Sequence, residues 1–184
     1  MKSWKADNLL RRVRESGNIV AKDKDHLRQL IEQRMKEFGP NCDLNDVDVS
    51  QVTDMSELFY ESKFNGDISD WDVSNVKNMF AMFYGSKFNG DISQWDVSNV
   101  EHMSSMFCNS DFNGDISQWD VSNVKNMDRM FENSKFNGDI SNWNVSRLMS
   151  CNGIFYKSPL DLGHKPEWWY TWRKRNAVIG RSDF

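Results

Sequence analysis

The sequence has few cysteines and no long apolar run, and both absences narrow the kind of protein it encodes. Its three cysteines, Cys42, Cys108 and Cys151, form an odd and widely spaced set, which fits reduced thiols in a cytosol better than a disulfide framework. No segment approaches the ~20 apolar residues of a membrane-spanning helix. The first residues, MKSWKADNLLRRVRES, lack the apolar core of a signal peptide. We therefore expect a cytoplasmic protein with no membrane partner.

The sequence also lacks the short motifs that would indicate catalysis. It contains no G-x-x-x-x-G-K-[ST], H-E-x-x-H or G-x-S-x-G pattern, which would indicate phosphate binding, zinc binding or an activated serine. Its three histidines, His26, His102 and His164, are not spaced with cysteines or carboxylates as metal ligands are. We therefore predict a protein that is not an enzyme and that needs no cofactor and no metal.

An internal repeat organises most of the chain. The words FNGDISQWDVSNV at residues 88–100 return letter for letter at residues 112–124. A tryptophan recurs every 24 residues, at Trp71, Trp95, Trp119 and Trp143, and the surrounding isoleucine, valine, methionine and phenylalanine positions keep the same period. Five units begin near residues 44, 68, 92, 116 and 140. A fixed period of this size predicts a solenoid, in which stacked units bury their apolar sides against each other.

Each unit reads as a short strand followed by a helix. Trp71 and Val73 alternate with Asp70 and Asp72, which predicts a strand with one buried face. Ser74 then stands where a helix N-cap belongs. Apolar residues follow at helical spacing, and an Asn-Gly turn leads to the next unit: Val76, Met79, Met82, Phe83, Asn89 and Gly90. The predicted fold class is α/β, a solenoid of about five 24-residue strand–helix repeats.

The repeated words also resemble a known family. WDVSNV, NMxxMF and FNGDIS recur across residues 44–160, and these units resemble the BspA-type repeats of bacterial surface proteins, a divergent leucine-rich-repeat family. Ile68-x-x-Trp71-x-Val73 matches the L-x-x-L-x-L spacing of leucine-rich repeats. The resemblance implies a right-handed solenoid like that of leucine-rich repeats, and a binding role that is often exercised at the cell surface.

The two ends of the chain are expected to close the repeat block, because the terminal units of a solenoid expose apolar edges. Residues 1–43 read as a helical N-terminal cap. Its main helix is predicted over Asp23–Phe38, followed by a stop at Gly39-Pro40, and a shorter helix is predicted near Leu9–Val13.

The C-terminal segment, residues 161–184, differs from the repeats in composition. Trp168, Trp169 and Trp172 lie at helical spacing, and Arg173-Lys174-Arg175 follow. One interpretation is an aromatic cap over the last unit. The other is an aromatic and basic patch that contacts a nucleic acid or an acidic partner.

Charge is distributed unevenly along the chain. Residues 1–40 carry ten basic and six acidic residues, a net charge of +4, whereas residues 41–160 carry eight and 18, a net charge of −10. Many of these acids form rows at the repeat period, and stacked strands would place them ~4.8 Å apart. Three alternatives explain such rows: local hydrogen bonds to backbone and cap groups, an acidic stripe that binds a basic partner, or a ladder of bound cations.

We predict that the strand face binds a protein partner, such as a basic or nucleic-acid-binding protein, rather than nucleic acid directly. One alternative is an acidic nucleic-acid mimic from a mobile element that inhibits a host defence enzyme. Another is a bacterial surface adhesin. The predicted binding residues lie in two strand positions and in the C-terminal segment: Asp46, Asp48, Asp70, Asp72, Gln94, Asp96, Gln118, Asp120, Trp169 and Arg173.

Overall fold

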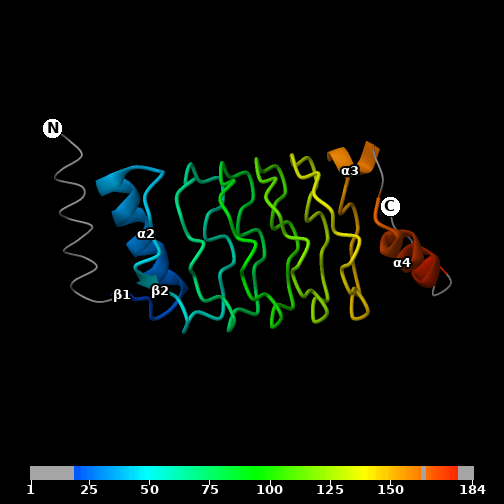
Figure 1. The fold of residues 1–184 in the computed structure, drawn as a ribbon, viewed down its shortest axis with the longest axis horizontal. Helices are drawn as coiled ribbons and strands as arrows, with labels where there is room; N and C mark the ends of the chain where they lie inside the picture. The colour runs from blue at the N-terminus through cyan, green and yellow to red at the C-terminus, as the bar shows by residue number, and fades with distance from the viewer. Residues whose placement is uncertain (1–18, 163–164, 178–184) are drawn as a thin grey trace.

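The chain forms an elongated stack of similar coils with helices at the two ends (Figure 1). The structure, a computed structural model, describes residues 19–162 and 165–177. Two short strands pair in parallel, Ile19 with Val47 and Val20 with Asp48, and so join the N-terminal segment to the first coil. The elements follow in the order β1 (Ile19–Val20), α2 (Lys24–Phe38), β2 (Val47–Asp48), α3 (Pro159–Leu162) and α4 (Glu167–Ala177).

The N-terminal helix confirms the prediction for this segment. The Asp23 side chain caps α2 by accepting an N–H of its first turn at 2.8 Å. The helix stops at Gly39, whose φ of 89° is open to glycine. Leu27 and Ile31 are buried against the first coil, so α2 covers the apolar edge that the stack would otherwise expose. The shorter helix predicted near Leu9–Val13 lies outside the described residues.

Between the two ends, the chain repeats one coil at the period of the sequence. Parallel bridges connect equivalent positions of neighbouring coils: Asp54, Asn78, His102, Asn126 and Ser150. We call the segments that begin at these positions the ladder segments: residues 54–61, 78–85, 102–109, 126–133 and 150–157. The assignment to a right-handed solenoid of the leucine-rich-repeat type stays a prediction.

The helix predicted inside each unit is wrong, because Asn78 forms a bridge and residues 80–85 form successive turns instead. The N–H groups of Met79, Ala81 and Phe83 leave their own coil and donate to carbonyls of the next coil at 2.9 Å. Ala81 has a φ of 50°, which an α-helix cannot contain. The predicted strand is formed in the first coil, where Val47 and Asp48, the equivalents of Trp71 and Asp72, make up β2. In the later coils the bridges lie at Asp67 and at Asn78 and its equivalents, and not at Trp71.

The interior consists of columns of identical side chains. Phe83 and Phe107 stack with ring centroids 5.6 Å apart and an angle of 1° between their planes. Trp71 and Val73 are buried while Asp72 is exposed, which confirms the predicted alternation. Like rings meet at every level because each coil places the same residue in the same environment, and such columns supply most of the apolar burial that stabilises the stack.

The C-terminal helix continues a ladder that the repeats begin. The Trp95 indole N–H donates to the Ile68 carbonyl of the preceding coil at 3.1 Å, and the other repeat tryptophans do the same. Trp168 of α4 donates in the same way to Ile140, at 2.8 Å, and Trp172 donates to Leu148 at 3.0 Å. The predicted helical spacing of these residues is confirmed by α4, and their indole rings pack on the last coil.

One repeat unit carries acids where both neighbouring units carry lysines. The Asp111 carboxylate accepts from Lys87 at 3.0 Å and from Lys135 at 2.7 Å. Glu101, in the same unit, pairs with Lys125. These ion pairs connect consecutive coils on the surface.

Candidate binding surface

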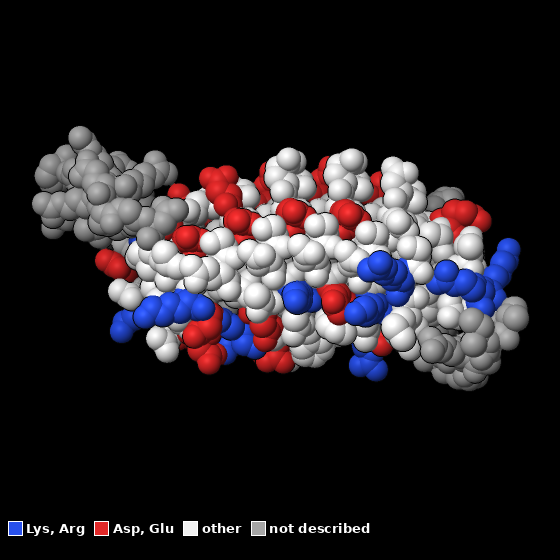
Figure 2. Space-filling model, turned by 90° about the horizontal axis from the view of Figure 1, so that it is seen from below, with Lys and Arg blue, Asp and Glu red and all other residues white. Residues whose placement is uncertain are grey.

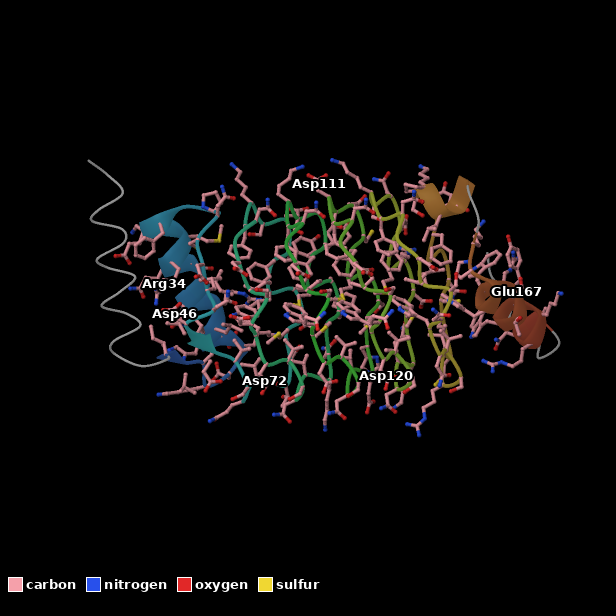
Figure 3. The ribbon with its side chains drawn as sticks, in the orientation of Figure 1. Arg34, Asp46, Asp72, Asp111, Asp120 and Glu167 are labelled. Carbon is pink, nitrogen blue, oxygen red and sulfur yellow. The ribbon has the colours of Figure 1, made fainter. Side chains whose placement is uncertain are left out.

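The acidic strand position forms a column along one long edge of the stack. We call Asp48, Asp72, Asp96 and Asp120 the Asp column. Figure 3 places Asp72 and Asp120 on the same edge, opposite to Asp111. The last three members of the column are exposed, whereas the first is half-buried beside β1. Figure 2 shows this edge, where acidic side chains recur at regular intervals along the stack.

Each carboxylate of the Asp column is held by its own backbone. One oxygen accepts the N–H of the serine two residues later, at 2.9–3.0 Å in all four units. This arrangement corresponds to the first of the three alternatives for the acidic rows. The Ser74 hydroxyl and then the Ser74 N–H stabilise the charged form of Asp72 and lower its pKa, and Ser122 lowers the pKa of Asp120 in the same way.

The second strand position, Asp46, Asp70, Gln94 and Gln118, divides into two kinds of residue. The last three are exposed and lie beside the Asp column. The Asp46 carboxylate instead accepts from the guanidinium of Arg34 on α2 (Figure 3), and their side chains are only 15% and 8% exposed. This ion pair fastens α2 to the first coil, so Asp46 has a structural contact that the other three lack in the described part of the chain.

The two predicted binding residues of the C-terminal segment lie elsewhere. Trp169 and Arg173 belong to α4 at the end of the stack, apart from the edge that carries Asp72 and Asp120 (Figures 1 and 3). The Trp169 ring contacts two cations, with Lys165 Nζ and the Arg173 guanidinium carbon each 4.8 Å from the ring centroid. The structure therefore does not bring these two residues together with the Asp column.

A cleft that the sequence did not predict lies between α4 and the coil that follows the last member of the Asp column. It has a volume of about 360 Å³ and is bounded by residues 143–146 of the last coil and by α4. Its lining includes the acidic side chain of Glu167 and the basic side chain of Arg175, with Thr171 between them along α4. The only signal in the sequence was Asn144, which continues the register of the Asp column but gives no indication of where α4 docks.

Two further properties of the described residues concern metal ions and membranes. In residues 19–162 and 165–177, no three His, Cys, Asp or Glu side chains come close enough to hold a metal ion. None of the described helices has the length and apolar composition needed to cross a bilayer.

The cysteines are free thiols, and all three are buried. Cys108 stands at a position that Tyr84 and Glu132 occupy in the neighbouring units, and such variation in sequence predicts a surface thiol. That prediction is wrong: Cys108 is only 4% exposed, and burial, followed by the nearby Glu132 charge, raises its pKa to about 11. The Cys108 thiol is therefore protonated at neutral pH.

Two overlapping segments of the chain match one family model. Residues 26–111 and 87–169 each match the family described as "Mycoplasma protein of unknown function, DUF285". Together the two matches run from α2 into α4 and span more than three quarters of the 184 residues. Matches that overlap within a repeated block are expected of a repeat family. Neither the curated proteins nor the solved structures include a match to the chain.

Proposed function

The chain belongs to the DUF285 family, a repeat family of bacterial origin, and on that premise we propose that it is a non-catalytic module that binds a protein partner through the Asp column. The finer proposal is a right-handed solenoid of the BspA-type, leucine-rich-repeat kind. We further propose that the protein acts in the cytoplasm and that its partner is basic.

One observation carries this proposal: a row of exposed carboxylates is held in fixed positions by backbone bonds. Asp72, Asp96 and Asp120 each have one oxygen tied to a serine N–H of their own turn. A side chain that is already ordered loses less conformational freedom when a partner binds. Neighbouring members are separated by about one coil, ~4.8 Å, so basic side chains at matching intervals would be recognised together.

The experiment is affinity capture from a lysate of the source bacterium, with quantification of the captured partner. The test variant changes Asp72, Asp96 and Asp120 to Asn. Asparagine keeps the turn bond, because Asn144 accepts the N–H of Ser146 in the same way, so the variant removes charge and leaves the backbone in place.

A matched control variant removes the same number of charges from another acidic row. Asp91, Asp115 and Asp139 are exposed and accept the same kind of serine N–H. We expect the partner to be lost in the test variant and kept in the control. Loss in both variants, or in neither, would contradict binding through the Asp column.

A second candidate is an acidic nucleic-acid mimic that inhibits a host defence enzyme, which the net charge of −10 over residues 41–160 supports. A mimic is displaced from its partner by added DNA and weakened by salt. A complex that resists both would exclude this candidate. The surface adhesin rests on the family resemblance, and recovery of the protein from the cytosolic fraction only would exclude it.

A further inference from the structure

The backbone of each ladder segment is polarised along the axis of the stack. In one segment, every second N–H donates to the next coil at 2.8–2.9 Å: Met79 to His102, Ala81 to Ser104, Phe83 to Met106 and Gly85 to Cys108. The carbonyls between these donors point the opposite way and accept from the preceding coil. The positive φ values of Ala81 and Gly85, 50° and 62°, produce this alternation. Where no further coil follows, the N–H groups of such a ladder form an open edge, and the edge of a sheet can bind anions.

The same polarity repeats from the first ladder segment to the last. Peptide dipoles that align head to tail add up, as they do in a helix, so the stack has an acceptor end at residues 54–61 and a donor end at residues 150–157. A cation lies at the acceptor end, where Lys24 Nζ binds Asp54 at 3.0 Å and Ser56 at 2.9 Å. A carboxylate lies at the donor end, where Asp161 accepts the N–H of Lys157 at 3.2 Å.

The donor end has further N–H groups that have no following coil to which they could donate a hydrogen bond. Gly153 and Phe155 occupy the positions of Ala81 and Phe83 in the last segment, and Gly153 has the same positive φ, 63°. Within residues 19–162 and 165–177, the N–H groups of Gly153 and Phe155 have no acceptor. Both residues line a hollow between the last coil and α4 of about 190 Å³, far larger than the ~30 Å³ that one water occupies in the liquid.

The side chains around this hollow add positive charge to the donor end. Its lining includes Lys165, Arg173, Trp169 and one carboxylate, Asp161. Lys165 pairs with Asp161 at 2.9 Å, which places a fixed ammonium beside the open N–H row. Arg173 also lines the hollow and lies over the Trp169 ring. The hollow therefore combines backbone donors, the positive end of the aligned dipoles and the side chains of Lys165 and Arg173.

We propose that this hollow is an oxyanion site, in which the N–H groups of Gly153 and Phe155 and the side chains of Lys165 and Arg173 bind a carboxylate or phosphate group. Backbone N–H groups bind one oxyanion face and the cations bind the other. The site lies at the C-terminal end of the stack and is independent of the Asp column.

The test follows the amide signals of isotope-labelled protein by nuclear magnetic resonance at neutral pH and constant ionic strength. Inorganic phosphate, acetate and chloride are titrated separately. We expect saturable shifts of the Gly153 and Phe155 amides with phosphate, acetate or both, and chloride serves as the reference for screening. The tighter of the two oxyanions identifies the source of the natural ligand. The absence of a saturable shift at these two amides with either oxyanion overturns the proposal.

Two matched variants separate this site from general surface charge. Arg173→Gln removes a cation that lines the hollow, whereas Lys174→Gln removes its neighbour on α4, which is exposed and does not line the hollow. We expect the dissociation constant to rise by about fivefold or more in Arg173→Gln and by less than about twofold in Lys174→Gln. Equal weakening in the two variants overturns the proposal. Lys165→Gln provides the same comparison if Arg173→Gln loses the dispersed spectrum of the folded protein.

Discussion

The ion pair between α2 and the first coil predicts that Asp46→Asn lowers the stability of the protein. The substitution leaves the guanidinium of Arg34, whose side chain is 8% exposed, with a neutral acceptor. Breaking a buried pair from one side costs about 3–5 kcal/mol. The retained amide oxygen and the 15% exposure of the Asp46 side chain reduce the expected loss in the free energy of unfolding to about 2–4 kcal/mol. Urea unfolding followed by far-ultraviolet circular dichroism measures it.

Two further variants make this reasoning refutable. Asp72→Asn removes the same charge from an exposed turn and should change the free energy of unfolding by less than about 0.5 kcal/mol. Arg34→Met, added to Asp46→Asn, removes the unpaired cation and should recover about half of the loss or more. The reasoning fails if Asp46→Asn costs no more than Asp72→Asn, or if adding Arg34→Met recovers nothing.

Three other predictions follow from single contacts. Asp111→Asn should cost about 0.5–1.5 kcal/mol at neutral pH, because it removes the carboxylate that accepts from two lysines. Those lysine bonds lower the pKa of Asp111, so its contribution is complete above about pH 4 and is lost as the pH falls through the lowered pKa; urea unfolding across this range should show the difference between Asp111→Asn and wild type vanish, and a difference that persists at the acid end would contradict the prediction. Trp168→Phe should cost about 0.5–1.5 kcal/mol and speed hydrogen exchange in α4, because the Ile140 carbonyl loses its indole donor; unchanged exchange would contradict the capping role. Cys108, with a pKa raised to about 11 by burial, should react with a thiol reagent no faster than the protein unfolds, and reaction at the rate of a free thiol in native protein would contradict its burial.

The sequence predicted the repeat because side-chain spacing reports burial directly. The 24-residue recurrence of Trp71 and its equivalents, and the alternation around them, follow from which side chains face the interior. The backbone path between them was not predictable from the same spacing. Apolar residues at 76, 79, 82 and 83 fit a helix, but they fit equally a turn ladder whose bonds run to a coil 23 residues later. Ala81 stands at a positive φ without being a glycine. The weak signals were Gly153 at its equivalent in the last coil, and Gly85 with Asn109 and Asn133 at the equivalents of Gly85.

The candidate site was predictable to the extent that its geometry is local. The Asp-x-Ser turns of the Asp column involve residues two apart, and the sequence alone favoured hydrogen bonds of this kind. The contact of Asp46 depends on Arg34, which lies 12 residues earlier on a separate helix. The hollow that Gly153 lines depends on how α4 docks. Such long-range contacts leave no periodic trace in the sequence, so Asp46 and Asp70, which occupy the same repeat position, looked equivalent.

The identical sequences at residues 88–100 and 112–124 could allow coils to stack in a wrong order, and the varied residues between them disfavour this. Because equivalent coils present the same core, a coil could stack on a wrong neighbour with little loss of packing. In the native order, Asp111 lies between Lys87 and Lys135 and pairs with both. If the unit that carries Asp111 were looped out, the coils on either side would meet and place these two lysines against each other. The same error would place Lys77 against Lys125, because Glu101 normally lies between them. Like charges across adjacent strands are destabilising, so the varied positions favour one order of otherwise interchangeable coils.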